Sequence, residues 1–338
     1  MNVVPASTTG SVPIGVVADI GGTNARFATA LMDSQGRISL GDERKLLTAE
    51  YPSFEAAYHH YSEGISFTPK LGVFAVAGPT VHEEVRLTNC PWVLRPGSLH
   101  RRVGLEQVRL VNDFEAIANS IGMIDPAQFR RLDDGAPFQL IDDGNVSIVG
   151  PGSGLGVSLL HRKDGKSHVV PCEGGHIGFA PADDVDIHIL RFLLTRYPRV
   201  SAERLVSGPG LAQIYIALAQ LEGRAIVPPQ SIALWDAAVS GSDPHARIAL
   251  ERWLMLLGTV AGDIALAQGA QAVILAGGIL PRFKGEFATC LLLSRFRAKG
   301  RFETLMQDIP VALIEHHEPG LLGAAAILED LSQPGASL

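Results

Sequence analysis

Residues 15–30 read GVVADIGGTNARFATA. The runs 15–20 and 26–30 are apolar and rich in strand-forming residues, and the four residues between them tolerate the positive φ angles of a tight turn. This stretch therefore predicts a β-hairpin closed by a glycine turn at 21–24.

The composition of this turn suits a phosphate group. Glycine has no Cβ, so a phosphate can approach the backbone closely and accept several N–H groups at once. Asp19, just before the turn, would repel a phosphate unless a Mg²⁺ lies between them. Mg²⁺ favours one or two carboxylates together with phosphate oxygens, which makes the combination sensible. The residues alone leave a second interpretation open, in which Asp19 only caps a tight hairpin.

A second strand–turn–strand pattern occurs at residues 146–160, VSIVGPGSGLGVSLL, about 130 residues after the first. A further glycine pair, Gly277-Gly278, follows the short apolar run 272–276. None of these is the GxGxxG fingerprint of dinucleotide-binding folds, and the chain has no GxxxxGK[ST] phosphate loop. The two hairpins indicate an internal duplication, and the three turns together are much more specific than any one of them.

Strand-like and helix-like stretches alternate along the chain. Strand-like runs recur at 71–77 and 108–111, and helical patterns cover 51–61, 114–121 and 246–268. Such alternation predicts an α/β protein with mixed sheets. A length of 338 residues exceeds what one hydrophobic core usually serves, so two domains are expected.

Composition disfavours several classes of protein. The formal net charge is −7 and there is no long basic run, so no nucleic-acid partner is expected. No run reaches about 18 uninterrupted apolar residues, so no membrane span is expected. Residues 1–12 carry no Lys or Arg, which argues against a secretory signal. The cysteines, Cys90, Cys172 and Cys290, are few and widely spaced, which indicates reduced thiols in a cytoplasmic protein.

Asn112 and Asp113 are the first candidates for a substrate site. They follow the strand-like run 108–111 and begin the helical pattern 114–121. Asn or Asp at the start of a helix is most often a plain N-cap, so the residues alone do not assign them a chemical role.

Glu173, His176 and Glu203 are further polar candidates. Two glycines separate Glu173 from His176 and would let a ligand approach, and a carboxylate can accept two hydroxyl protons at once. The alternatives are a structural histidine and, for Glu203, a solvated helix residue paired with arginine.

Seven short motifs follow one another over residues 19–279: DIGGTNARFA, LTNCPW, VNDFEA, GPGSGLG, CEGGH, SAERLVSGPGL and ILAGGI. With this set the chain resembles the bacterial glucokinases, within the wider superfamily of sugar kinases, heat-shock chaperones and actin. The resemblance extends from about residue 15 to 328. It implies an α/β fold of the two-domain actin-like ATPase (ribonuclease H-like) type with a cleft between the lobes. Residues 1–123 plus 314–338 would form a small discontinuous domain, and residues 124–313 a large one.

The resemblance also implies a reaction and its residues. The reaction would be ATP-dependent phosphorylation of the 6-hydroxyl of glucose to glucose 6-phosphate, the entry to glycolysis, with Mg-ATP as cofactor. Asp113 would be the general base, and the sugar-binding residues would be Asn112, Asp113, Glu173, His176, Glu203 and Asn89, with Thr88 beside Asn89. The ATP-binding residues would be Ala18, Asp19, Ile20, Gly21, Gly22, Thr23, Gly152, Ser153, Gly154, Gly277 and Gly278. Asp19 would hold Mg²⁺ through water.

Three functions stay open at this point. The first is a glucose kinase, with glucose and ATP as partners. The second is a kinase of another hexose or of an N-acetylated amino sugar, because the pocket residues bind hydroxyls that these sugars share. The third is a sugar-sensing protein without catalysis, which the intact Asp113 and glycine turns disfavour. Residues 178–181, GFAP, stand where zinc-containing relatives carry a cysteine-rich stretch, which disfavours the repressor branch. The oligomeric state is left open, with a homodimer as one option.

Overall fold

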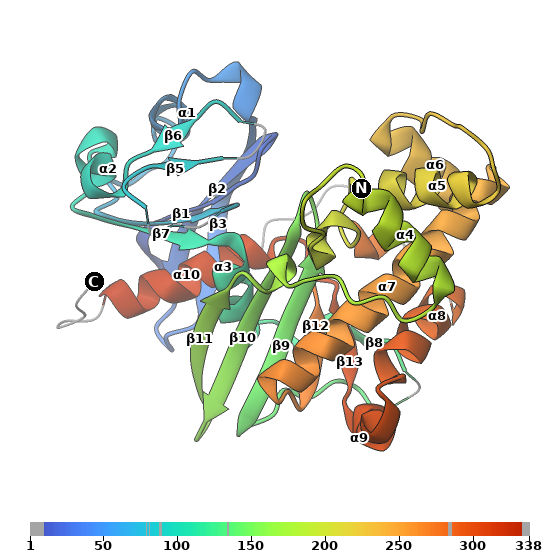
Figure 1. The fold of residues 1–338 in the computed structure, drawn as a ribbon. Coiled ribbons are helices and arrows are strands. Elements are labelled where there is room, and N and C mark those ends of the chain that lie inside the picture. Colours follow the sequence, from blue (N-terminus) through green and yellow to red (C-terminus); the bar gives the residue numbers. More distant parts are fainter. Residues whose placement is uncertain are drawn as a thin grey trace. The chain divides into compact units, whose positions relative to one another are not determined.

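The computed structural model describes residues 10–78, 80, 82–87, 90–133, 135–282 and 286–332, with the backbone alone for 286–288. The chain divides into two compact units (Figure 1). Unit 1 comprises Met1–Ile124 and His317–Leu338, and unit 2 comprises Asp125–His316. The domain boundaries expected from the sequence stay a prediction.

A five-stranded sheet lies at the centre of unit 1, in the order β3-β2-β1-β4-β7 (Figure 1). The strands are β1 (Val12–Ile20), β2 (Asn24–Met32), β3 (Ile38–Leu47), β4 (Leu71–Val76) and β7 (Gln107–Asn112). The predicted hairpin is confirmed, because β1 and β2 pair antiparallel with Asp19 opposite Arg26. Strands β4 and β7 add in parallel to β1, so the carboxyl ends of these three strands lie at one edge of the sheet.

The two faces of this sheet bury different cores, as the two-residue repeat of a strand requires. Val16, Ala18 and Ile20 of β1 pack in an aromatic-rich cluster, to which helix α1 (Phe54–Ser62) contributes. Val17 points to the opposite face and packs in an aliphatic cluster with helices α3 (Asp113–Ser120) and α10 (Pro319–Ser332). The other elements of unit 1 are η1 (Thr48–Glu50), β5 (Val85–Arg86), β6 (Val93–Leu94) and α2 (Pro96–Val103).

Helices α10 and α3 approach each other very closely. A Cβ on Gly323 of α10 would lie 1.6 Å from the carbonyl oxygen of Ala116 in α3. No side chain fits in that space, so glycine at this position lets the C-terminal segment pack against the helix that follows β7.

A six-stranded sheet lies at the centre of unit 2, in the order β11-β10-β9-β12-β13-β8 (Figure 1). The strands are β8 (Phe129–Arg131), β9 (Gly144–Pro151), β10 (Leu155–Lys163), β11 (Lys166–Cys172), β12 (Ala272–Leu275) and β13 (Val311–Ile314). Like β3-β2-β1, the strands β11-β10-β9 are an antiparallel meander, and parallel strands follow on its β9 side. The sheets therefore agree with the duplication that the two hairpins indicate.

The helices of unit 2 are α4 (Asp184–Leu194), α5 (Gly210–Leu221), α6 (Ser231–Ser240), α7 (Pro244–Gln268), α8 (Glu286–Arg297) and α9 (Glu303–Asp308). Short 3₁₀ turns are η2 (Pro126–Gln128), η3 (Gly174–His176), η4 (Ala202–Arg204), η5 (Leu280–Arg282) and η6 (Gly300–Phe302). The predicted long helix is α7, and it carries much of the core of this unit.

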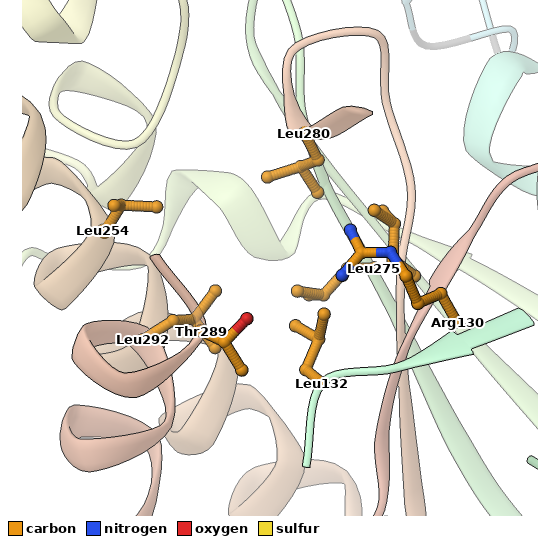
Figure 2. A pocket seen from close by; sticks show the side chains of 8 residues that line it. Arg130, Leu132, Leu254, Leu275, Leu280, Thr289 and Leu292 are labelled. Atoms are coloured by element: carbon orange, nitrogen blue, oxygen red, sulfur yellow. The ribbon is translucent and has the colours of Figure 1, made fainter. Parts of the chain in front are cut away.

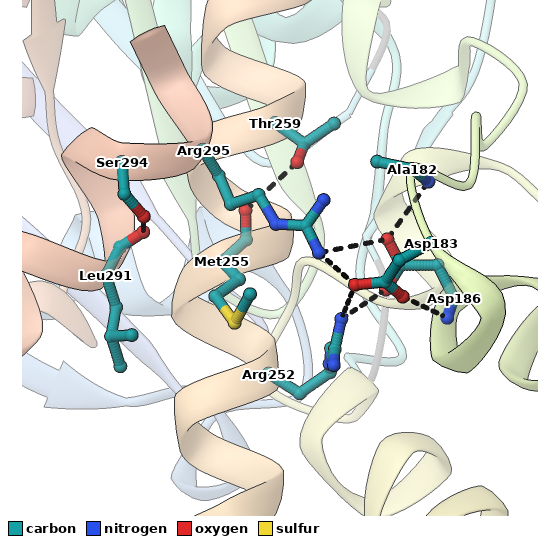
Figure 3. A network of polar contacts seen from close by, with 9 residues as sticks. All are labelled: Ala182, Asp183, Asp186, Arg252, Met255, Thr259, Leu291, Ser294 and Arg295. Carbon is teal, nitrogen blue, oxygen red and sulfur yellow. Dashed lines mark hydrogen bonds and ion pairs between the residues drawn. The ribbon is translucent and has the colours of Figure 1, made fainter. Parts of the chain in front are cut away.

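A cluster of four charged residues connects α4, α7 and α8 (Figure 3). Arg252 donates to Asp183 at 2.6 Å and to the fully buried Asp186 at 3.0 Å, and Arg295 also pairs with Asp183. Burial raises the pKa of Asp183, but the hydrogen bond from Arg252, the N–H of Asp186 and the two arginine charges outweigh it and lower the pKa to about 2. These ionic contacts therefore join three helices of one unit.

Candidate functional site

The first glycine turn is held by its carbonyl groups. The Gly21 N–H donates to the Asn24 carbonyl at 2.9 Å, and Thr48 donates to the Gly22 and Thr23 carbonyls at 2.9 and 3.0 Å. Among the described residues, the N–H groups of Gly22 and Thr23 have no hydrogen-bond acceptor. Consecutive free N–H groups in a turn form a site for an anion such as a phosphate oxygen.

Asp19 lies directly before this turn and beside a cation. Its Oδ2 is 3.7 Å from Arg26 Nη1 across the hairpin, and its side chain is 25% exposed. Burial raises the pKa of Asp19, while the charge of Arg26 lowers it. Arg26 also forms an ion pair with Glu318, in which Arg26 Nε is 2.9 Å from Glu318 Oε1. The angles at this contact are not those of a hydrogen bond.

This carboxylate fits the chemistry of a water-mediated Mg²⁺. A part of Asp19 faces solvent, and a single carboxylate beside a phosphate-type turn is a donor set that Mg²⁺ accepts when it keeps most of its waters. Within the described ranges, no group of three or more His, Cys, Asp or Glu side chains could hold a metal ion directly. Residues in this part of the chain therefore suit a hydrated ion better than a closed protein site.

The strand β7 ends in Asn112, and α3 begins at Asp113. The Asn112 Oδ1 accepts from the N–H groups of Phe114 and Glu115 at 2.8 and 3.3 Å, so Asn112 is the N-cap, as the plain interpretation expected. Its Nδ2 donates to the Gly78 carbonyl at 3.2 Å, which leaves one amide hydrogen for a further acceptor. Asp113 accepts from the Phe114 N–H at 3.0 Å. Because β7 and β1 both run parallel to β4, Asn112 and Asp113 lie at the same sheet edge as the first turn.

The second glycine turn and the Gly277-Gly278 pair lie together in unit 2. The Gly152 N–H donates to the Gly154 carbonyl at 2.8 Å, which closes this turn one residue more tightly than the bond from Gly21 to Asn24 closes the first. Within the described part of the chain, the N–H groups of Ser153 and Gly154 lack an acceptor. Gly277 has a φ of 109°, and a Cβ there would lie 2.5 Å from the Pro151 carbonyl oxygen, so Gly277 packs against the turn.

Glu173, His176 and Glu203 form a polar cluster beside this turn. His176 Nε2 is 3.9 Å from Glu173 Oε2, and His176 Nδ1 is 4.0 Å from Glu203 Oε1. The turn η3 holds His176 in place, because a Cβ on Gly175 would lie 2.0 Å from the Leu155 carbonyl oxygen. Glu173 and His176 are more than half exposed, which leaves them available to a ligand.

The structure thus assembles two sets of predicted residues, one in each unit. Unit 1 brings together Asp19, the first turn, Asn112 and Asp113, and unit 2 brings together the second turn, the Gly277-Gly278 pair and the cluster around His176. Asn89 and Thr88 lie outside the described residues.

Arg26 and Glu318 are site neighbours that the sequence reasoning missed. In a hairpin with a four-residue turn at 21–24, Arg26 lies opposite Asp19. The strand register could therefore have predicted that Arg26 is a neighbour of Asp19. Glu318 precedes α10, some 300 residues from Asp19, and no local pattern connects the two.

A small, mainly apolar cavity lies in unit 2 (Figure 2). It has a volume of about 30 Å³ and is lined by Arg130, Leu132, Leu254, Leu275, Leu280, Thr289, Leu292 and Leu313. At about 10–15 Å³ for each water molecule, that volume holds about two of them, so the cavity as it stands does not accommodate a nucleotide base.

The chain is similar to known glucokinases over most of its length. The family model described as Glucokinase matches residues 16–331. The curated glucokinase of Zymomonas mobilis is 43% identical over 312 residues, covering 92% of this chain and 96% of its own length. The crystal structure of a glucokinase from an Antarctic psychrotroph superposes with a TM-score of 0.80 at 33% identity, covering 93% of this chain and 98% of its own.

A more distant solved structure shares the fold. A ROK family glucokinase from Streptomyces griseus, in complex with glucose and AMPPNP, superposes with a TM-score of 0.56 at 21% identity, covering 93% of this chain and 98% of its own. The α/β class expected from the sequence is confirmed, and the fold is that of glucokinases and ROK-family sugar kinases. In the described residues no helix is both long and apolar enough to cross a membrane. The family match and the curated identity together show that this chain is an enzyme of the glucokinase family.

Proposed function

We propose that this protein transfers the γ-phosphoryl group of Mg-ATP to the 6-hydroxyl of glucose, with Asp113 as the general base. The observation that carries the proposal is the geometry at the end of β7. Asn112 supplies the N-cap of α3, so the fold does not need the Asp113 carboxylate for that purpose. Asp113 lies at the sheet edge that also holds a phosphate-type turn, where a base for phosphoryl transfer is required.

The two glycine turns support the nucleotide part of the proposal. Each has a closing hydrogen bond and, among the described residues, two N–H groups without acceptors, at Gly22 and Thr23 in one and at Ser153 and Gly154 in the other. Ala18 and Ile20 flank Asp19 in β1 and would support it from the backbone. Gly277 packs against Pro151 at the second turn, and Gly277 and Gly278 would lie near the adenosine.

Asp19 would hold Mg²⁺ through water. When bound, Mg²⁺ neutralises charge that accumulates on the phosphate oxygens. Arg26 keeps the carboxylate at the turn, since it lies between Asp19 and Glu318.

The polar cluster of unit 2 supports the sugar part of the proposal. His176 Nε2 lies 3.9 Å from a carboxylate oxygen of Glu173, and His176 Nδ1 lies 4.0 Å from one of Glu203, so a sugar hydroxyl beside either pair would reach both of its atoms. Asn112 has one amide hydrogen to add, and Asn89 is a further proposed contact. Replacing any of the three cluster residues by Ala would leave hydroxyls unpaired, at about 1–3 kcal/mol each.

The proposed reaction requires these residues to position the sugar and ATP and to accept one proton. The oxygen of the 6-hydroxyl bonds to the γ-phosphorus while the bond to the leaving ADP oxygen breaks, and the hydroxyl proton goes to Asp113. Water must be kept away from the reacting phosphoryl group, because ATP would otherwise be hydrolysed. The reaction would take place in the cytoplasm as the entry to glycolysis.

A coupled assay of ADP release with Mg-ATP tests the proposal. The panel would contain glucose, mannose, fructose and two N-acetylated amino sugars, each at several concentrations. The highest kcat/KM with glucose is expected. A higher value with another sugar would assign that sugar instead, and saturable glucose binding without any turnover would support the sensor.

A further inference from the structure

One carboxylate in unit 2 contacts both the polar cluster and the second glycine turn. Glu203 Oε2 accepts the N–H of Leu155, the residue that follows the turn, at 3.0 Å. Its other oxygen, Oε1, lies 4.0 Å from His176 Nδ1 in the cluster. The two oxygens of one side chain thus face the two halves of the site.

The turn is shaped around this carboxylate. A Cβ on Gly154 would lie 2.4 Å from Glu203 Oε2, so the carboxylate occupies the space where a side chain at that position would be. The segment that carries Glu203 contacts the turn a second time, because the Gly208 N–H donates to the Gly152 carbonyl at 2.8 Å. The start of that segment is itself held, since the Ala202 N–H donates to the Ile177 carbonyl at 2.9 Å. A movement of the Glu203 side chain would therefore displace the turn that carries the N–H groups of Ser153 and Gly154.

We infer that Glu203 couples hexose binding to nucleotide binding within unit 2. Hexose hydroxyls that donate to Oε1 fix the orientation of the carboxylate, and Oε2 then holds Leu155 and the turn in the conformation that receives phosphate oxygens. The sugar raises the affinity for the nucleotide by ordering this turn, and by reciprocity the nucleotide raises the affinity for the sugar by the same factor. The inference rests on the proposed function, which assigns sugar to the cluster and phosphate to the turn.

Calorimetric titration of the full chain with Mg-AMPPNP, with and without glucose well above its own dissociation constant, measures the coupling. The wild type is expected to bind Mg-AMPPNP more tightly with glucose, by a factor in the range of about 5–150. Glu203→Ala should bind it more weakly without glucose and lose most of the glucose-dependent factor. Glu203→Gln keeps an oxygen for the Leu155 N–H, so it should keep the affinity without glucose and lose part of the factor.

Glu173→Ala is the matched control. Glu173 lies beside His176, as Glu203 does, but its side chain makes no hydrogen bond or ion pair with the turn among the described residues. This variant should bind glucose less tightly and yet keep the full factor once glucose is saturating, which also shows that the factor does not come from sugar affinity alone.

The outcomes separate this inference from the proposed function. Equal weakening of Mg-AMPPNP binding with and without glucose in Glu203→Ala would mean a purely structural role and would overturn the coupling. The coupling is also overturned if glucose does not change the affinity of the wild type for Mg-AMPPNP. It is overturned as well if both Glu203 variants keep the glucose-dependent factor of the wild type. If glucose affinity is unchanged in both Glu173→Ala and Glu203→Ala, glucose does not bind at this cluster, and the proposed sugar site is refuted. Should Glu203→Ala fail to fold, the Gln variant decides.

Discussion

Replacement of Asp113 by Asn is the sharpest test of the proposed chemistry. The amide has nearly the shape of the carboxylate but does not accept a proton from a hydroxyl at neutral pH. Loss of a general base typically lowers turnover by about 10²–10⁴-fold. At about 1.4 kcal/mol per factor of ten, this corresponds to roughly 3–5 kcal/mol in the barrier.

The structure predicts that the same change costs little stability. The cap hydrogen bonds of α3 belong to Asn112, and the amide oxygen of an Asn at 113 can still accept the Phe114 N–H. The interaction of a negative charge with the helix N-terminus, which is lost, is worth about 0.3–1 kcal/mol. The melting temperature should therefore fall by only a few degrees.

Glu115→Gln is the matched control, because Glu115 also carries a charge in the first turn of α3 and pairs with Arg109 at 2.9 Å. It should lose similar stability and keep its turnover number. Initial rates in the coupled assay, thermal melts and glucose affinity by calorimetry would be measured for both variants. Turnover of Asp113→Asn within tenfold of wild type, or an equal loss in Glu115→Gln, would show that Asp113 is not the base.

Three further changes test other parts of the structure. Activity should vanish with excess EDTA and return with Mg²⁺, and Asp19→Ala should raise the Mg²⁺ concentration needed for Mg-AMPPNP binding; an unchanged Mg²⁺ dependence would remove Asp19 from the metal. Gly323→Ala should lower the unfolding free energy by about 1–3 kcal/mol, because crowding against Ala116 exceeds the helix propensity gained. The uncrowded Gly97→Ala should not, and equal melting temperatures for both would refute the close crossing. The folded-state pKa of Asp183 is about 2 against a usual 3.8, so its contribution to stability is present above that usual value and is lost as the pH falls toward 2. Urea titrations between pH 5 and 2 should show a smaller acid loss in Asp183→Asn, and parallel curves would contradict this.

The hairpins were predictable from the sequence because their signal is local. A run of strand-forming residues, a turn that tolerates positive φ and a second run specify β1–β2 and β9–β10 without any distant information. The edge strands β3 and β11 lacked this signal. Strand β3, ISLGDERKLL, has no buried residue and carries four charges near its middle, and β11, KSHVVPC, is almost entirely exposed. Neither shows a clear apolar alternation, and both are extended because they pair with a neighbouring strand.

The residues that belong to the site were easier to predict from the sequence than the contacts between them. The motifs assign Glu203 to the sugar through resemblance, but the plain alternative of a solvated helix residue is wrong, because Glu203 lies in a 3₁₀ turn and accepts the Leu155 N–H. These two residues are separated by 48 positions. Such contacts depend on how segments meet in three dimensions, and no local periodicity encodes them.

The packing of α10 against β1 and α3 has a consequence for synthesis on the ribosome. The aliphatic face of the first sheet, with Val17, Ala28 and Val73, is complete at residue 112, but the helix that covers it begins only at Pro319. At about 5–20 residues per second the ribosome needs about 10–40 s to make the intervening roughly 200 residues. During that interval unit 2 is still being made, since its inner strand β13 ends only at Ile314, and an apolar surface of unit 1 stays open to solvent and to other chains. The nascent protein therefore exposes the uncovered sheet of its first unit until almost the whole chain has been synthesised.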